Sequence, residues 1–382
     1  MDFDLTKAQE MIRKEVRKFA ERKIEPLAAD LDEREEFSAE LTRQMGSIGL
    51  FGMFVSEKFG GQNSDYLSYI IAIEELARID ASQAITVAAG NSLGIGPIYY
   101  FGTDTQKEKY LPRLCQGDGL WGFGLTEATA GSDAGGTLTR AEKKGDDWII
   151  NGSKIFITNA ACQMTEGVTV QAVTGKLPNG KPEYTCFLVE KNRPGFKAQP
   201  MHKKMMWRAS NTAELFFDNV RVPKDNVLGQ KGDGLHQMLS TLDRGRLSIG
   251  AMGLGGARGA YELALKYAQK RKQFGQPISQ FQAIAFKLAD CAVEIECGRN
   301  LLYKACWLVD QQRPFEKTAA MAKLYCSELM GRVVNHAVQI HGGYGLMKEY
   351  PIERFYRDQK VLDIGEGTSE IQRLIISRHI GC

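Results

Sequence analysis

The hydrophobic pattern of this 382-residue chain changes its period twice along the sequence. Residues 1 to about 120 repeat apolar side chains at helical spacing, residues 121–232 contain runs of period 2, and helical spacing returns from about residue 235. No helical segment separates consecutive strands in the middle block, so its sheet should be largely antiparallel. The pattern predicts an α+β chain with an N-terminal all-α domain (1–120), a middle antiparallel β-barrel or sandwich domain (121–232) and a C-terminal four-helix bundle (233–382).

Helix-start signals mark several expected elements. Thr6 with Gln9 forms a capping-box pattern, Ser38 is placed to cap another helix, and Thr105 should begin a short helix that ends near Gly117. The long helices of the last block should cover residues 257–271, 280–310, 316–341 and 368–379, in an up-down bundle joined by short loops.

Turn-forming residues separate the predicted strands of the middle block. Asn151-Gly152 stands between two β-branched runs and predicts a hairpin turn at that point. Pro178-Asn179-Gly180 predicts a second turn before the next strand.

Composition excludes several classes of protein. Lys and Arg number 49 and Asp and Glu 46, so the net charge is +3, and 43% of residues are hydrophobic. A long disordered chain would have fewer apolar residues and a larger net charge. Because the two signs of charge are interspersed, we expect no nucleic-acid partner.

Cysteine and histidine spacing argues against disulfides and metal. The eight cysteines form no Cys-x-x-Cys pair, and His336 and His341 lack partners at metal-ligand spacing. We therefore expect reduced thiols in a cytoplasmic protein without a metal site.

One uncharged stretch, residues 81–103, is long enough to suggest a membrane span. It contains Pro97, four glycines and several polar residues, so a buried helix over residues 81–100 is the better interpretation. The N-terminus shows no basic segment followed by an apolar one, so we expect neither a signal peptide nor membrane attachment.

Several short motifs could carry chemistry. Residues 117–122 match Gly-x-Gly-x-x-Gly, but this segment follows a helix and enters a strand, the reverse of a dinucleotide fingerprint. Residues 124–133 offer hydroxyls and backbone N–H groups directly after a strand. Phe156 and Thr158, two apart on a strand, could stack on a flat ring and bond to it.

Two further motifs lie in the last block. Arg271 and Phe274, near a helix end, could hold a phosphate and an adenine. Glu366, between Gly365 and Gly367, could be a mobile general base, because the flanking glycines let the backbone approach a ligand. Each motif alone is also compatible with an ordinary structural role, such as a helix end or a favourable charge at a helix start.

Taken together and in this order, these motifs resemble the acyl-CoA dehydrogenase family over essentially the whole chain. The segments that carry the resemblance are Gly124–Asp133, Ile155–Asn159, Arg208–Glu214, Val220–Pro223, Arg271–Gly275, Gln339–Gly345 and Glu366–Arg373.

The resemblance implies a homotetramer, a dimer of dimers, with one FAD per subunit. It implies that Phe123, Leu125 and Thr126 line the flavin and that Phe156 and Thr158 cover its other side. The family often has Tyr and Trp at the two Phe positions. The remaining cofactor positions are Ser132, Arg271, Phe274, Gln339, Gly343 and Thr368, of which Arg271 and Phe274 would reach the FAD of the neighbouring subunit.

The resemblance also implies the reaction and the substrate contacts. Glu366 would abstract the α-proton of an acyl-CoA thioester while N5 of FAD accepts the β-hydride, giving the 2-enoyl-CoA. Electrons would then pass to electron-transfer flavoprotein. Some members place the base on the opposite helix, where this chain has Gly245, which cannot serve. CoA would contact Ser132, Asp243 and Arg246.

One departure concerns the acyl group. Gly365 stands where short- and medium-chain members commonly carry Tyr, which predicts room for a branched or alicyclic acyl group such as cyclohexanecarboxyl. Asn91, near the middle of the uncharged helix, should line the acyl cavity. Few cationic residues lie there, which disfavours a dicarboxylic acyl group.

Two alternatives stay open at this point. A flavin-dependent oxidase or monooxygenase could have the same fold and react with O₂, although such monooxygenases usually lack the base at Glu366. A helical scaffold that binds no flavin would be colourless when purified.

Overall fold

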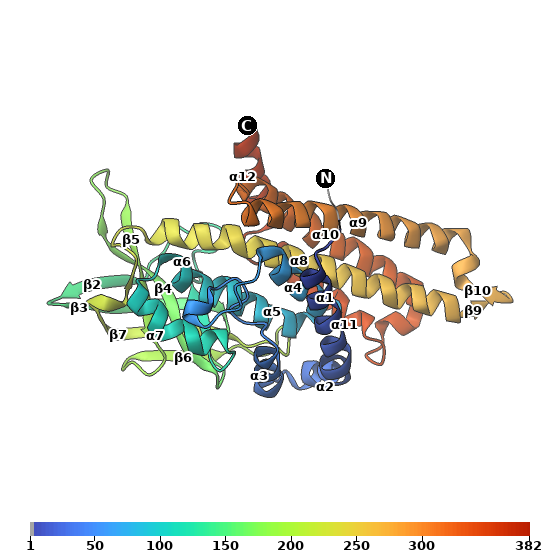
Figure 1. The fold of residues 1–382 in the computed structure, drawn as a ribbon, viewed down its shortest axis with the longest axis horizontal. Coiled ribbons are helices and arrows are strands. Elements are labelled where there is room, and N and C mark those ends of the chain that lie inside the picture. The colour runs from blue at the N-terminus through green and yellow to red at the C-terminus, as the bar shows by residue number, and fades with distance from the viewer. Residues whose placement is uncertain (1–3) are drawn as a thin grey trace.

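The computed structural model describes residues 4–382 and confirms the helix–β–helix order (Figure 1). The N-terminal helices are α1 (Lys7–Phe19), η1 (Ala20–Ile24), α2 (Glu25–Arg34), α3 (Ala39–Ser47), η2 (Glu57–Phe59), α4 (Tyr66–Ala77), α5 (Ala81–Ala89), η3 (Gly90–Ile95), α6 (Gly96–Phe101) and α7 (Asp104–Cys115).

The predicted helix caps of this part are mostly confirmed. The Thr6 hydroxyl accepts a hydrogen bond from Gln9 N at 3.2 Å, and the Gln9 side chain accepts one from Thr6 N at 3.0 Å. Ser38 caps α3. The short helix predicted from Thr105 is present as α7 and begins one residue earlier, at Asp104, because Thr103 caps it and forms the capping box with Gln106.

The uncharged stretch is one continuous helical run, α5–η3–α6, with a π-helical segment at η3. Its residues are mostly buried against the rest of the protein. Within residues 4–382, no helix combines the length and apolar character that a membrane span needs.

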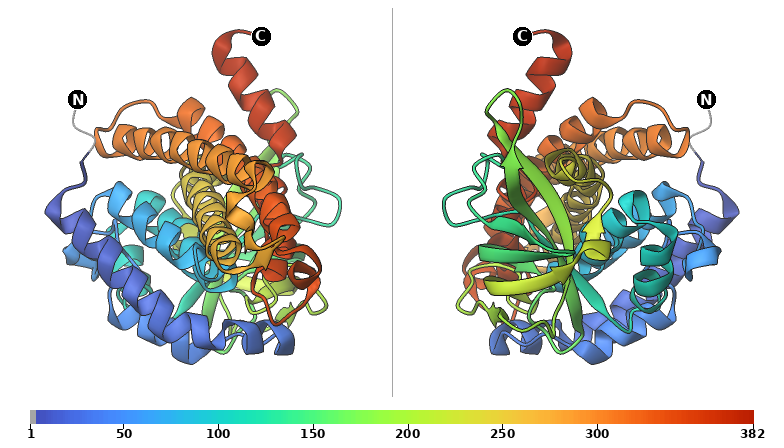
Figure 2. Two further views of the ribbon diagram at one scale, coloured as in Figure 1. Left: turned by 90° about the vertical axis from the view of Figure 1, so that its right-hand side faces the viewer. Right: turned by 90° about the vertical axis from the view of Figure 1, so that its left-hand side faces the viewer.

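The middle part forms one open, strongly twisted sheet rather than a closed barrel (Figure 2). Its strand order is β6-β7-β3-β2-β4-β5-β8, with β1 paired to β4. The pairs are antiparallel except β1–β4 and a single β2–β4 contact. The strands are β1 (Leu120–Gly124), β2 (Arg140–Lys144), β3 (Asp147–Thr158), β4 (Thr165–Lys176), β5 (Pro182–Glu190), β6 (Phe196–Pro200), β7 (Thr212–Pro223) and, after η4 (Lys224–Asn226), β8 (Val227–Leu228).

The hairpin predicted at Asn151-Gly152 is wrong, because β3 runs straight through both residues. Gly152 has φ +145°, and the register with β7 shifts there, as in a β-bulge. A Cβ at Gly152 would lie 2.5 Å from Thr139 Oγ1, so the glycine serves a close approach instead of a turn. The turn into β3 is at Gly145, whereas the turn predicted at residues 178–180 does join β4 to β5.

The C-terminal part is built on three long helices, α8 (Gly234–Lys270), α9 (Gln282–Asp310) and α10 (Glu316–His341). The short α12 (Ser369–Ile380) packs on α10 and projects from the body of the molecule (Figure 1). The connecting elements are β9 (Lys272–Gln273), β10 (Gln276–Pro277), η5 (Ile278–Gln280), η6 (Gly342–Leu346), α11 (Ile352–Asp358) and η7 (Gln359–Asp363).

Helix α8 begins at Gly234, well before the predicted start at residue 257. Glycine is a poor helix former, and α8 is rich in it, which hides this helix from pattern recognition. The packing explains the glycines. A Cβ at Gly253 would collide with Cys326 O of α10, and one at Gly259 with Arg78 O at the end of α4.

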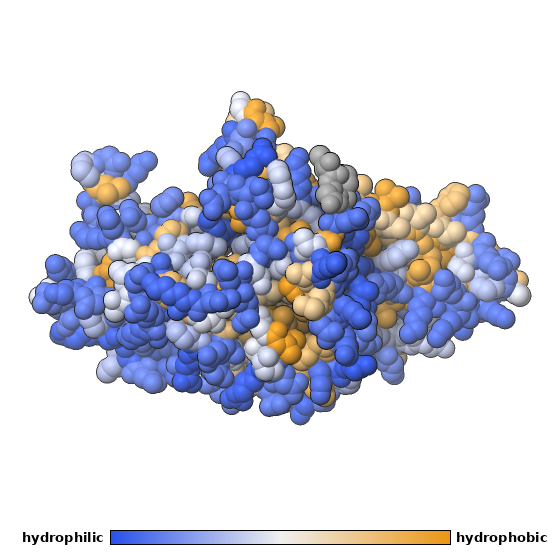
Figure 3. All heavy atoms as spheres, viewed as in Figure 1, coloured by the Kyte–Doolittle hydropathy of each residue, from blue (hydrophilic) through white to orange (hydrophobic). Residues whose placement is uncertain are grey.

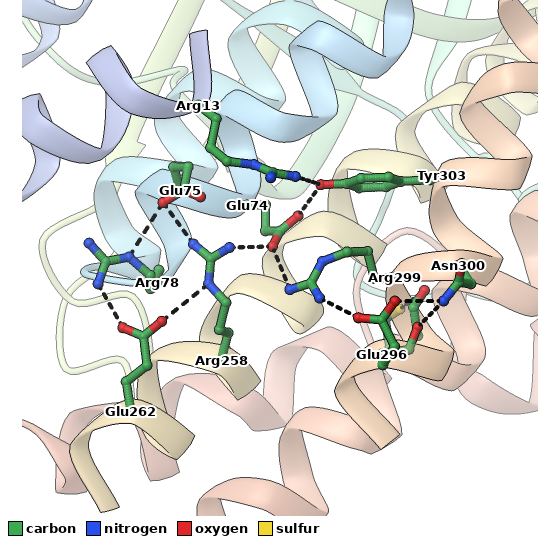
Figure 4. Close-up of polar contacts among 12 residues, drawn as sticks. Arg13, Glu74, Glu75, Arg78, Arg258, Glu262, Glu296, Arg299, Asn300 and Tyr303 are labelled. Atoms are coloured by element: carbon green, nitrogen blue, oxygen red, sulfur yellow. Dashed lines mark hydrogen bonds and ion pairs between the residues drawn. The ribbon is translucent and has the colours of Figure 1, made fainter. Parts of the chain in front are cut away.

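A buried ion-pair network joins α1 and α4 to α8 and α9 (Figure 4). Glu74 Oε1 lies 2.6 Å from Arg258 and 3.3 Å from Arg299, and its Oε2 accepts a hydrogen bond from Tyr303 at 2.8 Å. Glu75 pairs with Arg17 and Arg258. Both carboxylates are almost fully buried, so the network fixes the N-terminal domain against the bundle.

Candidate active site

Glu366 lies in the tight turn between η7 and α12. Its backbone is left-handed, with φ +52°, and Gly367 follows at φ +93°. Thr368, predicted near an FAD phosphate, is the N-cap of α12 and accepts a hydrogen bond from Ile371 N at 3.3 Å. The turn therefore directs the Glu366 side chain away from the α12 axis and back toward the bundle.

The carboxyl group of Glu366 packs against Gly245 of α8. A Cβ built at Gly245 would collide with Glu366 Oε2 and lie 3.0 Å from Cδ. Oε2 is buried and has no hydrogen-bond partner among residues 4–382. Gly245 thus provides the space in which this carboxylate lies, and a larger residue would displace it.

The surroundings of Glu366 favour proton acceptance near neutral pH. Burial raises the pKa of the Glu366 carboxyl to about 7, while the charges of Lys323 and Arg246 act in the opposite direction. A general base is most effective when its pKa lies near the working pH. Glu366 therefore has two properties of a general base: a buried oxygen without a hydrogen-bond partner and a pKa near neutral pH.

Two predicted CoA contacts lie one turn of α8 apart. Arg246 is buried and forms an ion pair with Asp243. Burial is the main cause that raises the pKa of Asp243, and the Arg246 charge opposes it. Arg246 also acts on Glu366 through its charge, so the structure brings a predicted substrate contact and the predicted base into one site.

The predicted flavin-facing residues converge where the segment after β1 meets β3. Thr126 O accepts a hydrogen bond from Ile155 N at 3.0 Å, which places residue 126 beside Phe156. A bulge between Lys154 and Ile157 interrupts the strand alternation, and Phe156 has φ +62° with 62% of its surface exposed. Phe123 and Leu125 are buried, while Thr126 and Thr158 are partly exposed.

These residues fit a flavin ring. An exposed phenyl ring held by a left-handed backbone offers a face for stacking, and the neighbouring threonines offer hydroxyls that can bond to ring heteroatoms.

The four residues predicted for the ADP half of FAD lie at the other end of the molecule. Arg271 and Phe274 belong to the β9–β10 hairpin, at the opposite end of the long axis from the sheet (Figure 1). The Arg271 guanidinium lies 5.8 Å from the centre of the Tyr344 ring, which links it to the segment with Gln339 and Gly343. All four residues are exposed, and Phe274 reaches 93%.

The polar atoms of Asn91, which is predicted to line the acyl cavity, are bonded within the protein. Its side chain donates to Leu50 O and Val87 O and accepts from Met53 N, so all its polar atoms are used within the N-terminal domain. Ser132 is exposed on the loop after β1. Gly365 is partly exposed, and a Cβ there would meet only Val361, at 3.3 Å from its carbonyl oxygen.

Two fully buried lysines were not predicted. Lys154 donates to Leu125 O at 3.0 Å and to Glu127 at 2.7 Å, and thereby supports the flavin-facing segment. Lys323 donates to Gly367 O at 2.8 Å, directly after Glu366. A lysine within an otherwise apolar helix face, as in residues 319–326, is the signal that could have indicated Lys323.

Two further features of the described residues concern metal ligands and cavities. No group of three or more potential metal ligands occurs within residues 4–382. A cavity of about 480 Å³ lies between α1 and residues 48–64, but its lining includes none of the predicted cofactor or substrate residues.

Fold and site together define the class of protein. The buried, unpartnered Oε2 of Glu366 can accept a proton, and the exposed Phe156 ring with the neighbouring threonines suits a flat redox cofactor. These are the parts of a flavin-dependent oxidoreductase.

The chain belongs to the acyl-CoA dehydrogenase family. Family models for the N-terminal, middle and C-terminal acyl-CoA dehydrogenase domains match residues 6–118, 122–220 and 232–381. It is an enzyme that acts on acyl-CoA, and FAD is its cofactor.

Similar proteins cover the whole chain. The probable acyl-CoA dehydrogenase YngJ of Bacillus subtilis (strain 168) is 50% identical, with 100% of both chains covered. Butyryl-CoA dehydrogenase from Megasphaera elsdenii is 42% identical with a TM-score of 0.96 and full coverage of both chains. A chain in the structure described as the electron transferring flavoprotein of Acidaminococcus fermentans has the same TM-score, identity and coverage.

Proposed function

We propose that this enzyme dehydrogenates a short, branched or alicyclic acyl-CoA to the 2-enoyl-CoA, with Glu366 as the base, and that electron-transfer flavoprotein accepts the electrons. The observation that carries the proposal is that the Glu366 carboxylate packs against Gly245 and that its Oε2 is buried and has no hydrogen-bond partner among residues 4–382. Residues 1–120, 121–232 and 233–382 would act as one catalytic unit, since the cofactor site draws on the middle domain, the bundle and a second subunit.

The chain's own residues would divide the work as follows. Asp243, Arg246 and Ser132 would hold the CoA moiety, so that the α-carbon reaches Glu366. Oε2 of Glu366 would take the α-proton, and the backbone N–H of the same residue would donate to the thioester carbonyl as negative charge develops on it. FAD, when bound by the residues around Phe156, supplies the hydride acceptor. Desolvation of the Glu366 carboxyl raises its pKa, which makes the carboxylate more basic.

The size of the acyl group follows from Gly365. The similarity to butyryl-CoA dehydrogenase supports a short acyl chain. At Gly365 a Cβ would approach only Val361, so a side chain could stand there and its absence leaves room beside the base. A branched or alicyclic group would use this room.

Filling that room should narrow the substrate range. We expect Gly365→Tyr to raise the ratio of butyryl-CoA to cyclohexanecarboxyl-CoA turnover, in kcat/KM, by about tenfold or more, because pocket volume discriminates by about 1–3 kcal/mol per methylene. Gly365→Ala is the matched control and should change the ratio little. An unchanged ratio in the Tyr variant would refute the role of Gly365.

The cofactor site would be completed by a second copy of the chain. The predicted flavin and ADP contacts lie at opposite ends of one subunit, and the Phe274 side chain at the tip of the hairpin is almost fully exposed. Apolar side chains also gather on the exposed face of α9, toward the β9–β10 end of the molecule (Figure 3), where Phe286 and Val293 are exposed. These surfaces support a homotetramer, a dimer of dimers, in which Arg271 and Phe274 reach the FAD of a neighbour.

Reversing the charge at Arg271 tests this arrangement. We expect Arg271→Glu to weaken FAD binding by about tenfold or more, because a hydrogen bond to a charged group contributes about 1.5–3 kcal/mol. Lys272→Glu, one residue away in the same exposed hairpin, should retain FAD as the unaltered enzyme does. Flavin content after gel filtration is the measurement, and equal retention in both variants would exclude the role of Arg271.

An anaerobic screen tests the reaction and the substrate together. We expect short, branched and alicyclic acyl-CoAs to bleach the flavin absorbance, and glutaryl-CoA to do so much more slowly. The reduced enzyme should then be reoxidised faster by electron-transfer flavoprotein than by air. Preferential turnover of glutaryl-CoA would contradict the substrate proposal, and rapid reoxidation in air would favour an oxidase or a monooxygenase.

A further inference from the structure

We propose that Lys323 is a positioning residue for the reaction: its buried ammonium holds the turn that carries Glu366 and keeps the carboxylate available as a base. The inference rests on the proposed role of Glu366. It concerns a residue on α10 that lies outside the motifs of the cofactor and substrate sites.

The first observation is the placement of the ammonium group. Lys323 is fully buried, and its Nζ donates to Gly367 O at 2.8 Å. Within the described residues, no carboxylate oxygen lies within 4.0 Å of this Nζ. A buried cation without a close anion is costly unless something else compensates it, so its presence here requires a reason.

The second observation is the shape of the turn that Lys323 holds. Glu366 has a left-handed backbone, which is unfavourable for a residue with a side chain. The carbonyl of Gly367 accepts hydrogen bonds from both Lys323 and Gln372, and Gln372 also donates to Glu366 O at 3.3 Å. The two buried donors, Lys323 and Gln372, hold the backbone of the turn in place and so fix the direction of the Glu366 side chain.

The third observation is the charge around the site. The groups that face Glu366 are Lys323 on α10, Arg246 on α8 and Tyr69 on α4. The charged groups that influence the pKa of Lys323 are Glu366, Asp363 at the end of η7, Arg246 and Glu328. Arg246 is already paired with Asp243, so Lys323 is the cation near Glu366 that lacks an ion-pair partner of its own.

A purely structural role for Lys323 and a positioning role predict different pH profiles of kcat/KM for a variant that lacks the lysine. Burial raises the pKa of Glu366, and the Lys323 charge opposes this rise. If the charge of Lys323 is lost, the carboxylate should be protonated over a wider range of pH. The acid limb of the kcat/KM profile should then move upward, whereas a loss of packing alone would lower activity at every pH without moving that limb.

The test compares Lys323→Met with Gln372→Met in the FAD-loaded enzyme. Each variant removes one donor to Gly367 O, and Gln372→Met also removes the donor to Glu366 O, but only Lys323→Met removes a charge. We expect the acid limb of Lys323→Met to move upward by about one pH unit and that of Gln372→Met to remain in place. Flavin content should be unchanged in both, because neither residue lies among those predicted to contact FAD.

Further variants keep the test decisive. If Lys323→Met does not fold, Lys323→Gln, which keeps a donor without the charge, should show the same upward shift. Lys323→Arg, which keeps the charge, should restore the limb of the unaltered enzyme. An acid limb that stays in place in both uncharged variants would overturn the proposal. Inactivity of Glu366→Gln, measured in parallel, separates this outcome from a failure of the base assignment itself.

Discussion

Glu366→Gln is expected to bind acyl-CoA and yet fail to bleach the flavin under anaerobic conditions. Glutamine has nearly the same shape, so the turn and the packing against Gly245 should persist. It cannot accept the α-proton, however, and removal of a general base typically lowers the rate by about 10²–10⁴-fold. Stopped-flow absorbance of the flavin measures this loss directly, and ligand-induced spectral change measures binding.

The control for this variant is Glu370→Gln. Glu370 is an exposed carboxylate in the same segment, at the start of α12, and its loss should leave bleaching unchanged. Bleaching by Glu366→Gln at the rate of the unaltered enzyme would show that another group takes the proton.

The pH dependence of the unaltered enzyme follows from the same residue. Burial raises the pKa of Glu366 to about 7, and the base acts only when it is deprotonated. The rate should therefore increase as the pH rises through about 7 and should be lost below it. An ordinary exposed glutamate would place this limb near pH 4.

Local chemistry made much of the fold predictable. Thr6 and Ser38 cap their helices as expected, because hydroxyl capping depends only on near neighbours in sequence. Local sequence also explains the error at Asn151-Gly152. The pair is a good turn former, but in the structure it lies in a strand at a register shift, where Thr139 packs closely against Gly152. Pattern recognition cannot see such a tertiary contact.

The site likewise combines features that local sequence predicts with features that arise only from tertiary packing. Glu366 could be recognised between its glycines, but its strength as a base depends on the space at Gly245 and on burial, which arise only when α8, α10 and α12 pack together. Lys154 and Lys323 are ordinary charged residues in the sequence. Their burial and their carbonyl partners are products of the fold.

Asn91 shows what the structure adds to a residue that the sequence singles out. The sequence predicts that Asn91 lines the acyl cavity, and the structure adds that its side chain bonds to backbone groups of residues 50, 53 and 87. Buried polar side chains are most often bonded within the protein, and only the structure shows which partners they have.

Glu74→Ala should produce the largest loss of stability outside the active site. Glu74 is almost fully buried and compensates Arg258 and Arg299 at the junction of α4, α8 and α9 (Figure 4). Removing it would leave the buried guanidinium of Arg258 and the partly buried one of Arg299 without this partner, and the Tyr303 hydroxyl would lose its acceptor. Breaking a buried ion pair in this way typically costs about 3–5 kcal/mol in the free energy of unfolding.

Two controls separate the buried charge from side-chain loss in general. Glu294→Ala breaks a half-exposed ion pair with Arg332 on the same bundle and should cost at most about 1 kcal/mol. Glu74→Gln keeps the shape and an acceptor for Tyr303 but removes the charge, so its loss should fall between those of the two alanine variants. Denaturant unfolding, monitored by the release of flavin, ranks the variants by their loss in the free energy of unfolding. Equal stability of Glu74→Ala and Glu294→Ala would mean that the arginines find water or other anions, and that hydrophobic packing alone holds the N-terminal domain on the bundle.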